Sequence, residues 1–231
     1  MVASGLVLQL WLLRRQVRAV RAHREQVPQP FADSINPDQH ARAADYTIAQ
    51  ALLAAMQRIA GALLLVAMTL AGGIAAIDDR LTGIGLHGLS RQVAVIAAVT
   101  LVLVLAGLPF DTWRTFKIEA RFGFNRTTPA LFALDWLKGL AIAGGLMLPL
   151  AALLLWLMPR AGAAWWLWAW GAWALFSILI GWAWPRLIAP LFNRFHELES
   201  GPLRDAVESL ARRCGFEPRS VKVMDGSRRS T

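Results

Sequence analysis

The sequence predicts an all-α polytopic membrane protein with about five transmembrane helices, followed by the start of a small α/β cytoplasmic domain. Three observations predict this class. Of the 231 residues, 56% are hydrophobic and only 17% are charged, whereas an average soluble domain has about 25% charged residues. Apolar runs of membrane-spanning length recur along the chain, and basic residues gather in alternate segments between them. The chain also has 11 Trp but one Tyr, and Trp is favoured at the membrane–water interface.

The apolar runs define the expected spans. A spanning helix needs about 20 mostly apolar residues. Four runs meet or nearly meet this length: residues 59–77, 93–110, 139–158 and 165–184. The run over residues 2–13 is shorter, but no basic residue precedes it and no small-residue cleavage site follows. We therefore interpret it as a first span and not as a signal peptide. The transmembrane region is expected to cover residues 1–184, with residues 185–231 outside the membrane.

The Lys and Arg residues indicate how the spans are oriented. From the N-terminus, the successive segments between the apolar runs carry seven, two, five, one and nine of them. Segments rich in Lys and Arg are cytoplasmic by the positive-inside rule, so the N-terminus is predicted outside and the C-terminal segment in the cytoplasm. The net charge of +9 would also fit a nucleic-acid-binding protein. Because the basic residues lie between apolar runs, we expect the lipid bilayer as a partner and no nucleic acid.

The spans themselves are nearly free of charge. Residues 139–158 and 165–184 contain no Asp, Glu, Lys or Arg. A proton pump or ion-coupled transporter normally needs an ionisable residue inside the membrane, so the pattern argues against that class. The pairs Gly72-Gly73 and Gly144-Gly145 are expected to let helices approach closely. The single cysteine, Cys214, rules out an internal disulfide and is interpreted as a small apolar residue.

The segment after the first span is strongly basic. Five arginines fall within eleven residues, at Arg14, Arg15, Arg18, Arg21 and Arg24. Their spacing fits a helix that leaves the membrane and meets anionic lipid head groups, and a simple orientation signal explains them equally well. Farther along, Asn36 and Pro37 predict a helix start, with Asn as the cap. This helix is expected to run unbroken from Asp38 into the second span.

The segment between the third and fourth spans, DTWRTFKIEARFGFNRTTPALFALDWLKG, mixes aromatic and charged residues. Thr128 and Pro129 predict the start of the next long helix, since the hydroxyl can cap it and proline suits its first position. A tight turn is expected at Gly123 or Asn125. Such a segment either lies in the membrane interface or packs on the cytoplasmic domain. Our hypothesis is that residues 117–129 dock onto that domain.

The chain after the fifth span is expected to begin a folded domain. Two prolines in WPRLIAPLFNRF should end the fifth helix. An amphipathic helix should start at Pro202 and end at Gly215. Residues 221–224 alternate like a strand, and Asp225-Gly226 is a turn signal. One helix and one strand cannot enclose a core, so only the beginning of this domain is predicted.

Three motifs carry a resemblance to a known family. FKIEARFGFNRTTP, LIAPLFNRF and VMDGSRRST, in this order between the spans, resemble the integral-membrane zinc metallopeptidases of the CAAX prenyl protease type 1 family, with the bacterial branch most similar. The resemblance implies a metalloendopeptidase of the bacterial inner membrane, with a helical chamber open to the cytoplasm and a peptide or protein substrate. It also implies that a strand with His and Asn, a His-Glu-x-x-His helix and a further Glu follow the last motif and hold zinc. The candidate residues for domain docking or for contact near the substrate are Glu119, Arg121, Asn125, Arg126, Asp225, Arg228 and Arg229.

The zinc motif itself does not occur in this sequence. The four histidines are His23, His40, His87 and His196, and no two of them are four residues apart. HELES at residues 196–200 has Ser200 where a second ligand would stand, and it is expected in a loop. We therefore expect a chain truncated before the zinc motif, with no bound zinc and no activity alone, which a missing C-terminal catalytic half would complete. The alternative is a non-enzymatic membrane scaffold or interaction protein that kept the fold.

Overall fold

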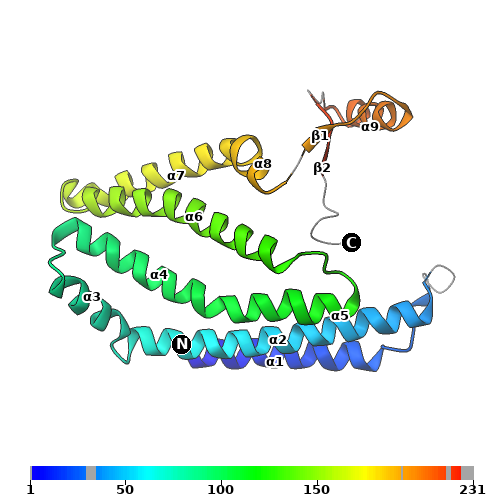
Figure 1. The fold of residues 1–231 in the computed structure, drawn as a ribbon, viewed down its shortest axis with the longest axis horizontal. Helices are drawn as coiled ribbons and strands as arrows, with labels where there is room; N and C mark the ends of the chain where they lie inside the picture. Colours follow the sequence, from blue (N-terminus) through cyan, green and yellow to red (C-terminus); the bar gives the residue numbers. More distant parts are fainter. Residues whose placement is uncertain (1, 30–34, 194, 217–219, 225–231) are drawn as a thin grey trace. The chain divides into compact units, whose positions relative to one another are not determined.

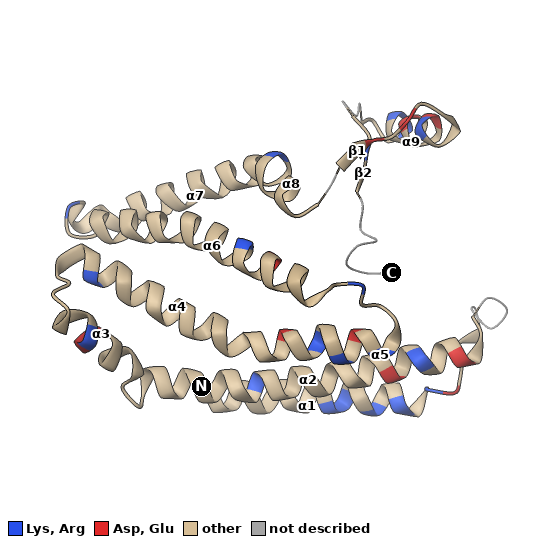
Figure 2. Ribbon diagram, viewed as in Figure 1, with Lys and Arg blue, Asp and Glu red and all other residues tan. Residues whose placement is uncertain are grey.

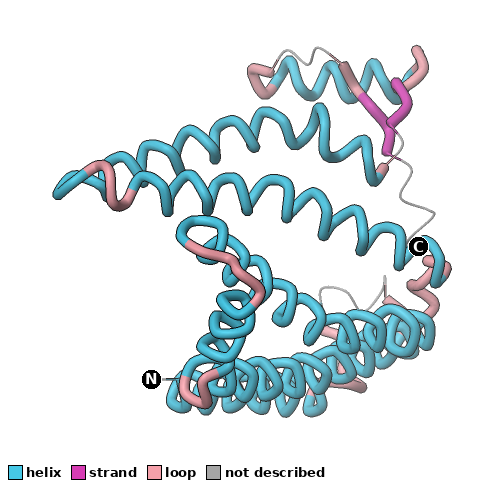
Figure 3. Tube along the Cα trace, turned by 60° about the vertical axis from the view of Figure 1, so that its left-hand side comes forward, coloured by secondary structure: helices cyan, strands magenta, loops and turns pink. Residues whose placement is uncertain are grey.

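The computed structural model describes residues 2–29, 35–193, 195–216 and 220–224. Within these ranges the chain is mostly helical, with one two-stranded sheet, as Figures 1 and 3 show. The chain divides into two compact units, which we describe separately. The first consists of Met1–Asn125 and Ile142–Trp156, and the second of Arg126–Ala141 and Leu157–Thr231.

The first unit begins with two long antiparallel helices, α1 (Val2–Ala22) and α2 (Pro37–Thr69), which lie side by side in Figure 1. The expected start of α2 is confirmed, because the Asn36 side chain accepts a hydrogen bond of 2.9 Å from the Asp38 backbone N–H. A helix of 33 residues is about 50 Å long. The hydrocarbon layer is about 30 Å thick, so part of α2 must extend beyond it.

The second predicted span differs from the structure at its end. Helix α2 ends at Thr69, and a new helix, α3 (Gly73–Gly83), starts after a break. Gly72 has a φ of 80°, a conformation that glycine adopts without strain. A Cβ on Gly73 would lie 2.9 Å from the Ala67 carbonyl oxygen. This glycine pair therefore forms a turn between two helices instead of a contact face between packed helices.

Helix α4 (Gly88–Trp113) is extended by a π-helical segment, η2 (Arg114–Glu119), and a short helix, α5 (Ala120–Phe122). The extension ends at Gly123. Its φ of 83° shows that the expected tight turn falls on this glycine. Helix α6 (Pro129–Leu157) starts where Thr128 and Pro129 predict it. The Thr128 hydroxyl oxygen accepts a hydrogen bond of 3.3 Å from the Leu131 backbone N–H.

Among the described residues, four helical stretches are long and apolar enough to cross a membrane: Pro37–Thr69, Gly88–Phe122, Pro129–Leu157 and Gly162–Phe192. The first predicted span, residues 2–13, lies in α1, which is not among them. Within the described residues only six hydrophobic side chains are buried, while large apolar side chains such as Leu63, Trp170 and Ile178 are 66 to 70% exposed. Surfaces of this kind suit contact with lipid and are unusual in water.

The second unit contains the short 3₁₀-helix η3 (Gly162–Ala164), followed by α7 (Trp165–Ala183), the π-helical η4 (Trp184–Ile188) and α8 (Ala189–Phe192). The helix ends at Phe192, within the stretch WPRLIAPLFNRF that was expected to end it, but the chain first passes Pro185 and Pro190 in π-helical and α-helical form. Pro185 has no N–H to give to the preceding turn. The wider π turn accommodates it, and the Arg186 guanidinium donates a hydrogen bond of 3.2 Å to the Trp182 carbonyl oxygen.

Two strands follow, β1 (Phe195–Glu197) and β2 (Lys222–Met224), with helix α9 (Pro202–Arg213) between them. The strands are antiparallel and pair Phe195 with Met224 and Glu197 with Lys222. The expected strand therefore has a partner, and the expectation that His196 lies in a loop is wrong. The predicted end of α9 is confirmed, since Gly215 has a φ of 78° after the last turn.

Candidate functional site

A polar clamp joins the first two helices at their charged ends, where Figure 2 shows blue and red segments close together. We define this clamp as Arg24, Asp45, His23 and His40. The Arg24 guanidinium donates two hydrogen bonds to the Asp45 carboxylate, at 2.8 and 2.9 Å. A bidentate pair of this kind fixes geometry as well as adding attraction. The His40 Nε2 atom lies 3.0 Å from the His23 carbonyl oxygen, which ties the start of α2 to the end of α1.

The segment around α5 packs on α2 beside this clamp. The Tyr46 ring meets Phe122 and Phe124 edge-on, with centroids 5.2 and 5.0 Å apart. The Phe124 and Asn125 backbone N–H groups both donate to the Glu119 carbonyl oxygen, at 2.9 and 3.3 Å. The turn at residues 123–125 is thus held in place by aromatic packing on one side and backbone hydrogen bonds on the other.

Three of the candidate residues, Glu119, Arg121 and Asn125, lie on the segment around α5. Glu119 and Asn125 are half-buried and Arg121 is exposed, with its guanidinium 5.7 Å from the centre of the Phe122 ring. Arg121 also adds positive charge near the Asp45 carboxylate. Arg126 is exposed and belongs to the second unit. Three candidates, Asp225, Arg228 and Arg229, lie outside the described residues.

Asn125 requires a correction. We expected that a left-handed turn could fall on either Gly123 or Asn125, but among the described residues only glycines have positive φ. Asn125 is therefore not strained, and a β-branched residue there would not meet the penalty of the left-handed region.

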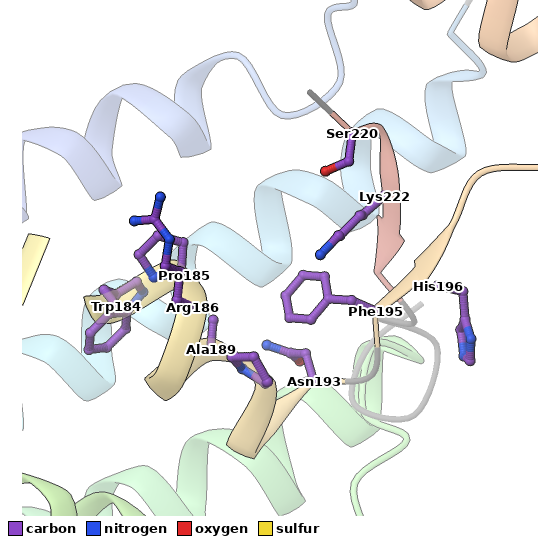
Figure 4. A pocket seen from close by; sticks show the side chains of 10 residues that line it. Trp184, Pro185, Arg186, Ala189, Asn193, Phe195, His196, Ser220 and Lys222 are labelled. Atoms are coloured by element: carbon purple, nitrogen blue, oxygen red, sulfur yellow. The ribbon is translucent and has the colours of Figure 1, made fainter. Parts of the chain in front are cut away.

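The second unit contains an open cavity of about 930 Å³ between η4, α8 and the sheet. Figure 4 shows Asn193, Phe195 and Lys222 close together, whereas His196 points away from them. The described lining residues include the cations Arg186 and Lys222 and no carboxylate. The described lining therefore suits an anionic or apolar group, and no carboxylate–histidine pair typical of a general acid–base site occurs among these residues.

An arginine connects helix α9 to the chain just after β1. Arg204 donates a hydrogen bond of 3.0 Å to the Leu198 carbonyl oxygen and another of 2.9 Å to the Glu208 carboxylate. The hydrogen bond from the Arg204 guanidinium lowers the pKa of Glu208 below its ordinary value. The same helix leaves Leu203 and Leu210 more than half exposed.

The family resemblance implies a zinc ion, which needs several His, Cys, Asp or Glu ligands close together. Within the described part of the chain, no three His, Cys, Asp or Glu side chains lie close enough together to hold a metal ion. The described residues therefore do not fit a zinc site, and no chemical step through a metal follows from them.

The long apolar helices, with their exposed hydrophobic surfaces and the charge-free stretches of α6 and α7, define a multi-pass integral membrane protein. Residues 16–194 match the family described as the CAAX prenyl protease N-terminal region with five membrane helices. The chain belongs to this family.

The relatives and a solved structure agree with this assignment. The chain is 38% identical to a probable CAAX prenyl protease 1 of Schizosaccharomyces pombe, over 58% of this chain and 28% of that protein. It is 26% identical to a CAAX prenyl protease 1 homolog of Caenorhabditis elegans, over all of this chain and 52% of that one. The crystal structure of Ste24p from S. mikatae has the same fold, with a TM-score of 0.91 at 24% identity, over 99% of this chain and 55% of that chain. This chain thus spans between about a quarter and half of the length of the curated relatives it matches.

Sequence reasoning missed the polar clamp and the part played by Tyr46. In the sequence Arg24 stands out only as part of a basic run, and no motif marks Asp45 or Tyr46. One signal was present. Two helices joined by a linker of modest length must be antiparallel neighbours, which brings residues shortly before the linker close to residues shortly after it.

Proposed function

We propose that this chain is the membrane-embedded N-terminal part of a zinc metalloendopeptidase of the CAAX prenyl protease type. The match of residues 16–194 to the N-terminal region of that family carries the proposal. In this role the long apolar helices anchor the chain in the membrane, and the family resemblance implies that the complete enzyme encloses a substrate chamber. The clamp and the Tyr46 contacts fix the helix ends at one side of the first unit.

The proposal includes a location and a substrate class. The membrane is the bacterial inner membrane, the C-terminal segment is cytoplasmic, and the substrate is a peptide or protein bound in extended form near a zinc helix of the complete enzyme. The alternation of basic residues between segments supports the cytoplasmic placement. The bacterial assignment rests on the similarity of the three sequence motifs alone.

Zinc binding and cleavage test the proposal with two proteins. We expect the purified 231-residue chain to hold no stoichiometric zinc by elemental analysis and to cleave no peptide. Joined to the C-terminal half of a family member with its His-Glu-x-x-His helix, it should bind one zinc per chain and cleave. A joined protein that folds and binds zinc but cleaves nothing would favour a scaffold. One tightly held zinc in the short chain, lost in His196→Ala, would contradict the expected absence of a site.

We also propose that residues 117–129 dock onto the cytoplasmic domain of the complete enzyme. The exposed guanidinium of Arg121 and the ordered turn at Gly123 support this. In the joined protein, Arg121→Ala should lower peptidase activity while membrane insertion and zinc content stay normal. Arg42→Ala, which removes an exposed arginine from the neighbouring α2 surface, serves as the matched control and should leave activity close to that of the parent. If Arg121→Ala cleaves like the parent, the docking proposal is wrong.

A further inference from the structure

Helix α1 has an inner and an outer face with different surroundings. The half-buried side chains recur every three or four residues, at Leu6, Leu10, Leu13, Val17 and Val20, and this inner face packs on α2. Successive helix residues turn by about 100°, so Val7, Trp11, Arg14, Arg18 and Arg21 share an arc of about 80° that is centred about 100° from the inner face, and Arg15 lies about 40° beyond this arc. Along this outer face the side chains change from apolar to cationic within about one helical turn, between Trp11 and Arg14.

Among the residues that the structure describes, no carboxylate pairs with the arginines of the outer face. Helix α1 contains no Asp or Glu. Within the described residues, Arg14, Arg15, Arg18 and Arg21 form no ion pair, whereas Arg24, in the turn after α1, binds Asp45. Like charges three or four residues apart destabilise a helix. An external anion would remove this repulsion.

The apolar end of the same face indicates the depth of the membrane. Val7 is 67% and Trp11 54% exposed, and Trp prefers the level of the lipid head groups. The Arg15 guanidinium lies 5.8 Å from the centre of the Trp11 ring. Arg14 to Arg18 follow Trp11 by about 5 to 10 Å along the helix, and the head-group layer is about 5 to 8 Å thick on each side. With Trp11 at the inner edge of this layer, Arg14 and Arg15 fall within it, and the long side chains of Arg18 and Arg21 can reach back to it from its water side.

We propose that Arg14, Arg15, Arg18 and Arg21 form a binding strip for the phosphate groups of anionic phospholipids. The cations complement the charge of these lipids, and the adjoining exposed Val7 and Trp11 continue the strip onto the acyl chains. Nucleic acid would use the arginines but would have no use for this apolar continuation. The strip is independent of the peptidase role proposed above, since it needs only α1.

The test uses the full 231-residue chain in detergent, titrated with phosphatidylglycerol or phosphatidylcholine and followed by native mass spectrometry. The parent should bind phosphatidylglycerol more tightly than phosphatidylcholine. Arg14→Gln/Arg18→Gln should weaken phosphatidylglycerol binding about tenfold or more, since each surface arginine contributes substantially to attraction by anionic lipid. The control, Arg212→Gln/Arg213→Gln, removes the same charge from exposed positions on α9 and should bind within about twofold of the parent.

A further variant and two competing ligands separate lipid binding from a folding defect and from binding of phosphate or DNA. Arg14→Lys/Arg18→Lys keeps the charge and should keep most of the binding, which guards against a folding defect in the glutamine variant. Glycerol phosphate or a short DNA duplex should not displace the lipid. Equal binding of the two lipids, an equal loss in the α9 control, or displacement by DNA would each overturn the proposal. The first of these results would leave the arginines as an orientation signal alone.

Discussion

Tyr46 connects α2 to the segment that follows α4 through two edge-on ring contacts. We expect Tyr46→Leu to lower the free energy of unfolding by about 1 to 3 kcal/mol, because each aromatic pair contributes about 0.5 to 1.5 kcal/mol beyond its buried area. Thermal unfolding in detergent should show a melting temperature several degrees below that of the parent. Tyr46→Phe keeps the ring and removes only the hydroxyl that accepts from Gln50. It should retain most of the stability, and an equal loss in both variants would show that the rings do not carry the effect.

Gly123 is the residue that the turn after α5 requires, with a φ of 83°. Gly123→Ala should destabilise the protein by about 1 kcal/mol or more, because a Cβ in the left-handed region meets the following carbonyl oxygen. Apart from Gly123 itself and its two chain neighbours, no atom lies within 4 Å of the place where a Cβ would stand, so the variant measures mainly backbone strain. Asn125→Val is the control and should cost less in chemical denaturation. The opposite order would show that the turn rearranges.

The residues that sequence could identify are those whose role is local. Asn36 and Thr128 are predicted as helix caps, and both side chains accept the expected backbone hydrogen bonds, because a cap depends only on neighbours in sequence. The Arg24–Asp45 pair joins residues 21 positions apart. Many carboxylates could have met this arginine, and only the register of α1 on α2 selects Asp45.

At the scale of elements, the fifth long helix shows where a local rule was overridden. Proline normally ends or kinks a helix, but α7 continues through η4 into α8. The Arg186 guanidinium donates a hydrogen bond to the Trp182 carbonyl oxygen and lies 4.9 Å from the centre of the Trp182 ring. The wider turn of a π-helix is not visible in a hydropathy pattern, so the sequence could not have predicted it. Strand β1 was missed because Phe195–Glu197 has one apolar residue followed by two polar ones and shows no alternation, whereas β2 lies in the alternating stretch 221–224.

Helix α9 should be sensitive to acid. The pKa of Glu208 is below its ordinary value in the folded state, so its contribution to stability is complete above the ordinary pKa and is lost as the pH falls through the lowered pKa. Hydrogen–deuterium exchange, corrected for intrinsic rates, should show α9 losing protection below about pH 4.5. Glu208→Gln cannot ionise and should be less protected at neutral pH and respond less to acid. A parallel acid response in the variant would assign the effect to other groups.

At the scale of the whole molecule, composition was sufficient to predict the class. Low charge, long apolar runs and abundant Trp predict a polytopic helical membrane protein, and the four apolar helices and the family match agree with that class. The break at Gly72 could not be placed, because a hydropathy pattern continues across a turn that keeps apolar residues on both sides. The candidate site could be predicted only as one segment of chain. Its packing against Tyr46 depends on which helices are neighbours.

The orientation in the membrane is the prediction that concerns the whole chain. Segments with seven, five and nine basic residues alternate with segments of two and one, and the basic segments should be cytoplasmic. Reporter fusions after Arg80 and Arg160 should therefore report the outside, and fusions after Arg24, Arg126 and Arg213 the cytoplasm. The fusion after Arg24 also tests whether α1 crosses the membrane, because its apolar part is short for a span. A cytoplasmic report there, together with an external N-terminal tag, requires α1 to cross. A cytoplasmic report at Arg160 would contradict the five-span topology, because α6 and α7 would then no longer cross as a pair.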